Sequence, residues 1–435
     1  MATTYPGGME VEEPVAPEPR GGPAGGATLV SAGWRDVRPV RRRAVPGERV
    51  SRISPLSPGT RLVHADLHNH TLISDGDGEP ARAFDSMRAA GLDVAAITDH
   101  AEIVAETLTA EELAAHPPPG SIDKAAWRRL KELADEAGED GAFVSLRGFE
   151  WSHPWLGHVN VWFSRHYLHP RKTASPSVAP LWRWLAEPGP GTPSPRLASL
   201  AGFNHPGREP GRFSGFAFDH AVAERLVSFE IFNRTEDFLF EGTDAGGTSP
   251  LVECLEAGWR PGLTGVSDEH GTSWGFEPGK GRTGLHVRSL TRAGVHAALL
   301  ERRCFATRLA GLRVDAVAGQ TPMGGLLAHS RGPVRFQLDV DRGPSWWGRR
   351  LLVQVLRPGR PMPVVAESVE VRVPRPDQPL LAFDVGVDAA DGSWAVLRVT
   401  DPAGPGDARA RGEFRAAGDA VAYTSPFYLV PAVPV

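Results

Sequence analysis

Six histidines, two aspartates and one glutamate are spaced along the chain in a way that suits metal binding. Two pairs, His68 with His70 and Asp268 with His270, are each separated by a single residue. Extended backbone directs side chains two residues apart to the same face, so each pair presents two ligands together. The candidate ligands are His68, His70, Asp75, His100, Glu150, His158, His205, Asp268 and His270.

This set of nine residues is too large for one metal ion. A zinc ion in a protein takes about four ligands, and a catalytic ion keeps one position open. We therefore expect two or three divalent ions as cofactors, and imidazole and carboxylate ligands without thiolate permit Zn, Mn or Fe. Two neighbouring ions that share a water lower its pKa toward neutrality, so the expected chemistry is hydrolysis by a bridging hydroxide.

The candidate ligands follow the ends of predicted strands. From residue 61 to about 309, short β-type runs alternate with helical patterns, which favours an α/β barrel of parallel strands over a sandwich. An open doubly wound sheet is the alternative. In a β/α barrel the C-terminal ends of the strands meet at one cleft, so distant ligands converge there. The expected strands lie at 61–67, 93–98, 143–149, 158–163, 200–204, 227–232, 262–267 and 304–307.

Two helical patterns support this alternation. One covers 80–91, and the other covers 121–138, where apolar residues recur every three or four positions. Ser121 is the predicted N-cap of the second helix, and Gly138 is predicted to end it.

The composition and the hydrophobic patterns along the chain predict four regions. Residues 1–28 are rich in Pro, Gly and Glu and predict a disordered leader. Residues 29–60 predict a segment that packs on a neighbouring domain, and residues 61–309 form the expected barrel. Residues 310–435 contain short strand-like runs between turns, which predicts an all-β accessory domain of sandwich type.

Composition excludes several classes of protein. Hydrophobic residues make up 41% and charged residues 23% of the 435 residues, so the chain has enough apolar material for a core. The sequence has no run of about 18 apolar residues and no secretory signal, and we expect a cytoplasmic protein without membrane contact. The net charge of -5 predicts no binding to nucleic acid. The only cysteines, Cys254 and Cys304, are expected to be reduced and buried.

An arginine and two acidic residues accompany the candidate ligands. Arg208 follows His205 by three positions and is expected to bind a substrate oxyanion, which favours a phosphoester. Arg212 is a weaker candidate for this role, because a solvated loop residue explains it equally well. Asp99 and Glu230 are expected either to orient ligands or to have structural partners.

Six sequence blocks occur in order: HADLHNHTLISDGDG, GLDVAAITDH, GFEW, GHVNV, FNHPGR and GVSDEH. Over residues 64–270 this order resembles the PHP (polymerase and histidinol phosphatase) superfamily of metallohydrolases. The later segment RTGLHVRSLTRAGVHAALLERRCFATR and the closing YTSPFYL look similar to the CehA/McbA-type branch. The resemblance implies a distorted (β/α)7 PHP-type barrel with a C-terminal all-β sandwich-like domain.

The resemblance also implies how the ligands are shared. His68, His70, Glu150 and Asp268 would hold one ion, and Glu150 would bridge to a second ion held by His158 and His205. Asp75, His100 and His270 would hold the third, although many members have a histidine where Asp75 stands.

The expected function is hydrolysis of a small-molecule phosphoester by a metal-dependent hydrolase. Arg208 is expected to hold the phosphate, and a water or Asp75 to protonate the leaving group. One alternative is hydrolysis of a carbamate, ester or amide, which the CehA/McbA-type resemblance implies. The other is a noncatalytic binding module that keeps metal for stability.

Overall fold

The structure is a computed structural model of the chain. It describes residues 50–101, 121–170, 176–187, 197–275 and 278–431. The predicted leader, 1–28, lies outside the described residues, as does the part of the predicted packing segment before residue 50. No helix in the described ranges is long and apolar enough to cross a membrane.

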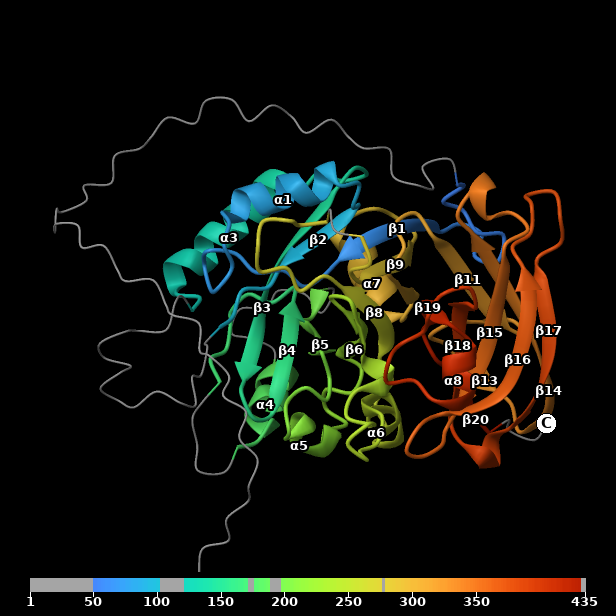
Figure 1. Cartoon of the computed structure of the whole chain (residues 1–435). Helices are drawn as coiled ribbons and strands as arrows, with labels where there is room; N and C mark the ends of the chain where they lie inside the picture. Colours follow the sequence, from blue (N-terminus) through green and yellow to red (C-terminus); the bar gives the residue numbers. More distant parts are fainter. Residues whose placement is uncertain (1–49, 102–120, 171–175, 188–196, 276–277, 432–435) are drawn as a thin grey trace, which may run out of the picture. The chain divides into compact units, whose positions relative to one another are not determined.

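The candidate ligands lie on a framework of strands between residues 61 and 307 (Figure 1). These strands are β1 (Arg61–Asp66), β2 (Val94–Ile97), β3 (Val144–His153), β4 (Gly157–Trp162), β5 (Leu200–Asn204), β6 (Leu226–Asn233), β7 (Glu236–Asp237), β8 (Gly262–Val266), β9 (Arg282–Val287) and β10 (Cys304–Thr307).

Helices connect many of these strands, and α1 and α3 pack beside β2 and β3 (Figure 1). The helices of this region are α1 (Pro80–Ala89), α3 (Lys124–Ala137), α4 (Ala179–Ala186), α5 (Arg212–Phe216), η2 (Phe238–Phe240), α6 (Pro250–Glu256) and α7 (Arg292–Leu300). The prediction that Ser121 is the N-cap of α3 is wrong. Asp123 caps α3, because its carboxylate accepts hydrogen bonds from the backbone N–H groups of Ala125 and Ala126.

The strand pairing is mixed, which corrects the expectation of parallel strands. The pairs β1/β2, β2/β3, β5/β6 and β6/β8 are parallel, but β3/β4, β4/β5, β1/β9 and β9/β10 are antiparallel. Only residues 154–156 separate β3 from β4. Such a short connection makes a hairpin, because a parallel crossover needs about a dozen residues or more.

Strand β8 is the last, along the chain, of the strands that are followed by candidate ligands. It forms a backbone ladder with β6, and it lies against β9 and β10, where the Thr283 hydroxyl donates to the Gly265 carbonyl at 2.8 Å. Within the described residues, no ladder between β8 and β9 closes the strands into a ring. The fold is therefore a mixed α/β arrangement around one large sheet.

The C-terminal residues are almost entirely β-structure. Their elements are β11 (Arg313–Ala318), β12 (Thr321–Pro322), β13 (Leu326–Ala328), β14 (Arg331–Asp341), η3 (Pro344–Trp346), β15 (Arg350–Arg357), β16 (Val364–Arg372), β17 (Leu381–Asp388), η4 (Ala389–Asp391), β18 (Trp394–Asp401), α8 (Gly412–Ala416), β19 (Asp419–Thr424) and β20 (Phe427–Val430). Strand β19 pairs with β10, so the large sheet continues into this region, while β12, β11, β14 and β17 form a second sheet.

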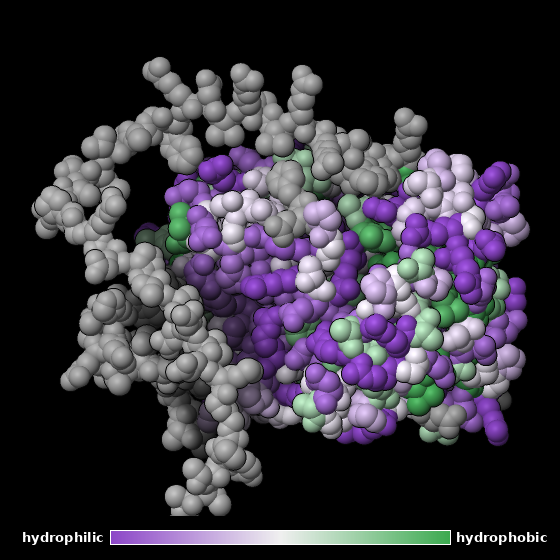
Figure 2. Space-filling view, viewed as in Figure 1, coloured by the Kyte–Doolittle hydropathy of each residue, from purple (hydrophilic) through white to green (hydrophobic). Residues whose placement is uncertain are grey.

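Apolar side chains of both sheets share a hydrophobic cluster, which includes Val314, Phe336, Val353 and Leu397. Burial of this surface is the main favourable term for holding the C-terminal strands together. Both cysteines are free and buried, as predicted. On the face that Figure 2 shows, hydrophilic residues predominate, and hydrophobic residues appear as scattered patches.

Candidate metal centre

The strand ends gather the nine predicted residues in one place. Backbone bridges join His100 to Glu150 and Asn69 to Glu269, so the ends of β1, β2, β3 and β8 are neighbours. The residues lie as follows: His68, His70 and Asp75 after β1, His100 after β2, Glu150 within β3, His158 in β4, His205 after β5, and Asp268 and His270 after β8. Their role as metal ligands stays a prediction.

Glu150 lies at the centre of the cluster, and its side chain is buried. Both of its carboxylate oxygens face imidazole nitrogens. The nitrogens are His68 Nε2 (3.3 Å), His158 Nδ1 (3.2 Å) and His205 Nε2 (3.5 Å) around Oε1, and His100 Nδ1 (2.7 Å) and His70 Nε2 (3.7 Å) around Oε2. A carboxylate in this position is suited to bridge two cations.

A second carboxylate, that of Asp268, lies at one side of the cluster. Oδ1 of Asp268 lies 3.4 Å from Nε2 of His68 and 3.4 Å from Nε2 of His70. Those two ring nitrogens lie only 3.0 Å apart. Two imidazole nitrogens and two carboxylates, those of Asp268 and Glu150, thus point at a common position.

Asp75 joins a further group of imidazoles at the more exposed edge. Its Oδ2 lies 3.5 Å from His100 Nε2 and 3.3 Å from His270 Nε2, and its Oδ1 lies 3.6 Å from His70 Nδ1. One ligand atom from each of these four residues lies within 4.8 Å of the others. Asp75 therefore lies among three imidazoles, and its role as a ligand stays a prediction.

The groups of the cluster shift one another's pKa values in opposite directions. The Glu150 carboxylate outweighs burial and raises the pKa of His100 to about 10, so an ion that binds there displaces a proton. Burial raises the pKa of the Glu150 carboxyl, but the imidazolium charges of His158, His100 and His68 outweigh burial and hold that pKa well below its usual value. Burial lowers the pKa of His70 to about 3, and the neighbouring His100 adds to this shift. An ionised carboxylate and a neutral imidazole are the forms that bind metal ions.

The donor set itself tests whether metal ions fit. At most one proton can lie between the Nε2 atoms of His68 and His70, which are 3.0 Å apart. Nδ1 of His205 and Oε2 of Glu209 are buried without a hydrogen-bond partner, although buried polar groups normally have one. Cations placed between them would satisfy these lone pairs. The residues present therefore fit a site for more than one divalent ion.

Glu209 was missed by the sequence analysis. It is 9% exposed, and its Oε1 lies 3.4 Å from Nδ1 of His205. Glu209, His205 and His158 form a further group whose ligand atoms lie within 4.8 Å of one another. Residues 205–209 form bends and turns and not a helix, with a φ of 101° at Gly207, so helical spacing did not point to Glu209.

Two buried carboxylates orient the candidate ligands. Glu230 Oε1 lies 2.8 Å from Nδ1 of His68, which leaves Nε2 of that ring to face Glu150. Asp99 accepts hydrogen bonds from the Thr71 and Ser74 hydroxyls, and Ser74 Oγ lies 3.4 Å from Nδ1 of His70. Such partners set the tautomer and the orientation of a metal-binding histidine.

Two arginines lie beside Asp268 at the edge of the cluster. Arg208 Nη1 lies 4.0 Å from Asp268 Oδ2, and Arg208 also pairs with Glu236 at 2.9 Å. Arg234, which the sequence analysis missed, lies closer: its Nε is 3.3 Å from Asp268 Oδ2, and its Nη2 is 3.0 Å from His270 Nδ1. Both side chains are partly exposed, at 37% and 44%.

Arg212 does not join this pair. Its guanidinium donates to the Glu253 carboxylate at 2.7 Å and to the Thr248 carbonyl at 2.8 Å. Arg212 thus anchors the segment before α6, and it is neither a free loop residue nor a neighbour of Asp268.

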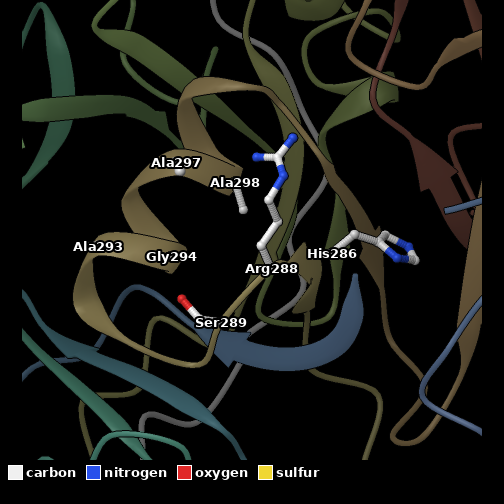
Figure 3. A pocket seen from close by; sticks show the side chains of 7 residues that line it. All are labelled: His286, Arg288, Ser289, Ala293, Gly294, Ala297 and Ala298. Carbon is white, nitrogen blue, oxygen red and sulfur yellow. The ribbon is translucent and has the colours of Figure 1, made fainter. Parts of the chain in front are cut away.

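A cavity of about 240 Å3 lies beside β9 and α7 (Figure 3). In this view the His286 ring points away from α7, and the Arg288 side chain extends beside the helix. Arg288 pairs with Glu301 at 2.6 Å. The lining of this cavity contains none of the nine candidate ligands, so it is separate from the cluster; its residues are His286, Arg288, Ser289, Ala293, Gly294, Ala297 and Ala298.

No family model and no curated protein matches this sequence. A solved two-domain protein from Bacteroides vulgatus, described as containing a predicted PHP-like metal-dependent phosphoesterase, is 15% identical with a TM-score of 0.44, over 87% of this chain and 98% of that one.

Two further solved structures each match 48% of this chain. A proposed metal-dependent phosphoesterase from Bifidobacterium adolescentis is 14% identical over 88% of its chain, with a TM-score of 0.27. An amidohydrolase from Chromobacterium violaceum with bound sulfate and no metal is 16% identical over 87% of its chain, with a TM-score of 0.24. These three likenesses are too weak to carry a conclusion about this chain.

Proposed function

We propose that this protein is a metal-dependent hydrolase of small-molecule phosphoesters, with a di- or trinuclear centre of Zn, Mn or Fe. The observation that carries the proposal is the position of Glu150, a buried carboxylate surrounded by five imidazoles. Divalent ions held there would polarise a phosphoryl group and lower the pKa of a water toward neutrality.

We assign the nine residues to the three groups that the family resemblance implies. His68, His70, Asp268 and Glu150 would hold one ion, and Glu150 would reach a second ion with His158 and His205. Asp75, His100 and His270 would hold the third. Asp75 faces ring nitrogens with both oxygens, which supports a ligand role over the role of proton donor to the leaving group.

Arg208 and Arg234 would bind the anionic oxygens of the substrate. Their guanidinium groups lie on the same side of Asp268, and guanidinium groups match phosphate oxygens in charge and geometry. A second cationic group beside the centre favours a phosphoester over an uncharged carbamate, ester or amide. It also favours a catalytic centre over a metal site that only stabilises the fold.

We also propose the division of the chain that the sequence suggests. Residues 61–309 would form a distorted PHP-type barrel that holds the centre, and residues 310–435 would form a sandwich-like accessory domain. The change after β10 from alternating strands and helices to almost pure β-structure supports this division.

The test is a panel of substrates with purified, metal-analysed protein. We expect p-nitrophenyl phosphate or bis-p-nitrophenyl phosphate to be hydrolysed and a naphthyl carbamate to be left intact. Turnover of the carbamate alone would replace the proposal with the carbonyl-hydrolase alternative. Protein that contains metal and hydrolyses none of the three would favour the noncatalytic alternative.

A further inference from the structure

One short segment of the chain has contacts on two sides. This rim segment, Arg234–Glu241, contains β7 and η2. Toward the metal centre, Arg234 lies beside Asp268, and Glu236 pairs with Arg208 at 2.9 Å. The Arg208 guanidinium also lies 5.5 Å from the centre of the Phe238 ring. The rim segment therefore carries one of the two arginines and provides partners for the other.

The other side of the rim segment contacts the C-terminal region. The Tyr423 hydroxyl of β19 donates to Asp237 Oδ2 at 2.8 Å. Arg409 donates to the Glu241 carboxylate at 2.7 Å and to the Asp237 carbonyl at 2.8 Å. Phe240 packs edge-on against Phe414, with ring centres 5.6 Å apart.

A buried network behind Tyr423 holds these contacts in place. Arg398 of β18 donates from Nε to the Tyr423 hydroxyl at 2.9 Å and from Nη1 to Gln354 Oε1 of β15 at 2.7 Å. Arg398, Tyr423 and Asp237 are each at most 1% exposed. The hydrogen bonds therefore run without interruption from three C-terminal strands, β15, β18 and β19, to the rim segment.

The rim segment has little structure of its own to fix its position. Strand β7 is two residues long, and η2 is three residues long. Elements this short depend on tertiary contacts, because few internal hydrogen bonds offset the entropy of ordering them. The contacts with Tyr423 and Arg409 are therefore well placed to set where Arg234 and the partners of Arg208 lie.

We infer that the C-terminal region sets the affinity of the centre for the anionic part of the substrate, and that Tyr423 and Arg409 are positioning residues for the two arginines. This inference rests on the proposed function, because it assumes that the arginines bind a phosphoryl group. It gives the C-terminal strands a role in substrate recognition.

The experiment uses the full chain loaded with metal, and inorganic phosphate as the probe. We compare Tyr423→Phe and Arg409→Gln with the wild type in phosphate affinity by calorimetry and in hydrogen exchange of residues 234–241. We expect phosphate affinity to fall about 5–20-fold and KM for p-nitrophenyl phosphate to rise similarly. We expect kcat within about twofold of wild type and an unchanged metal content, because neither residue contacts the cluster.

Two controls separate positioning from a general loss of stability. Arg335→Gln breaks an exposed pair with Asp384 between β14 and β17, and it is expected to leave phosphate affinity and exchange unchanged. In the background of Arg208→Ala, Tyr423→Phe is expected to weaken phosphate binding less than it does alone, because one of the arginines that it positions is absent.

Equal phosphate affinity and equal exchange in wild type, Tyr423→Phe and Arg409→Gln would overturn the inference, as would strictly additive effects in the double variant. Failure of the proposed function has a different signature. The wild type would then hold metal but hydrolyse neither phosphoester, whatever the variants do to exchange of the rim segment.

Discussion

Two buried polar clusters in this protein are built in different ways. In the network of Arg398, Tyr423, Asp237 and Gln354, each contact joins a donor to an acceptor. In the cluster around Glu150, ring nitrogens face one another and share the same carboxylate oxygens; His68 Nε2 and His70 Nε2 are 3.0 Å apart.

This difference separates a structural network from a binding site. Hydrogen-bonded pairs satisfy buried polar groups from within the protein, so they stabilise the fold and need no ligand. Converging lone pairs are stabilised only when protons or cations enter between them. Removal of a side chain should therefore affect metal binding in the cluster around Glu150 and folding in the network around Arg398.

The largest expected effect is on catalysis, from Glu150→Gln. Gln keeps the size of the side chain but removes the charge shared by five imidazoles, so phosphoester hydrolysis should fall on the order of 10³-fold, about 4 kcal/mol. Elemental analysis should show fewer ions per chain. Glu139→Gln, in an exposed pair with Arg88, is the control. Full activity and full metal content in Glu150→Gln would contradict the assignment.

The next effect is on folding, from Arg398→Met in the C-terminal network. The change removes donors to Tyr423 and Gln354 in a fully buried place, so the free energy of unfolding should fall by about 3 kcal/mol. Urea denaturation measures it. The folded variant should hold the wild-type number of ions. Loss of metal without loss of stability would remove the contrast between the two clusters.

A smaller effect is expected from Glu230→Gln, beside the metal cluster. An amide is a weaker partner than a carboxylate for Nδ1 of His68, so metal affinity should fall about 10–100-fold. Competition with a chelator gives this affinity. Glu224→Gln, which changes an exposed carboxylate that pairs with Arg302, should bind metal as the wild type does. Unchanged metal affinity in Glu230→Gln would make Glu230 a purely structural residue.

The smallest effect concerns a buried histidine outside both clusters. Burial, with the nearby charges of Arg282 and Arg52, lowers the pKa of His64 to about 3 in the folded protein. The unfolded chain takes up this proton near pH 6.5, so stability is full above that pH and falls as the pH drops toward 3. At pH 5.5 the loss is about 1.4 kcal/mol.

His64→Gln should therefore flatten the dependence of unfolding free energy on pH between about 6.5 and 5. Urea titrations at several pH values compare the two slopes. Identical slopes would show that His64 does not take part in the acid sensitivity of the fold. The pKa of His100, in the cluster around Glu150, shifts in the opposite direction from that of His64. The Glu150 carboxylate outweighs burial there and raises the pKa of His100 to about 10.

Much of the candidate site could be predicted because it depends on residue type and local spacing. The spacing of His68 and His70 after a strand predicts two ligands, and the structure brings both side chains to Glu150. Arg234 could not be found in this way, since its place beside Asp268 depends on the turn after β6, where Arg234 has a φ of 50°.

The fold was less predictable than the site. Alternation of strands and helices was visible, but the direction of β4 depended on a three-residue connection that was treated as a crossover. The cap of α3 at Asp123 was missed in favour of Ser121, although both residue types cap helices. The first error came from placing the end of β3 too early, at residue 149, because the structure continues that strand to His153. In the second case both residue types were acceptable caps, and Asp123 is the one whose carboxylate accepts from the first backbone N–H groups of α3.

The amino-acid sequence alone determined which candidate ligand atoms this protein has and roughly where along the strands they stand, because both follow from side-chain chemistry and the two-residue period of extended backbone. Only the tertiary structure decided which of them meet. The contact between Glu150 and His205, and the link from Tyr423 to Asp237, join residues far apart in the chain. Such contacts arise from strand pairing and burial across the whole sheet, which no local pattern encodes.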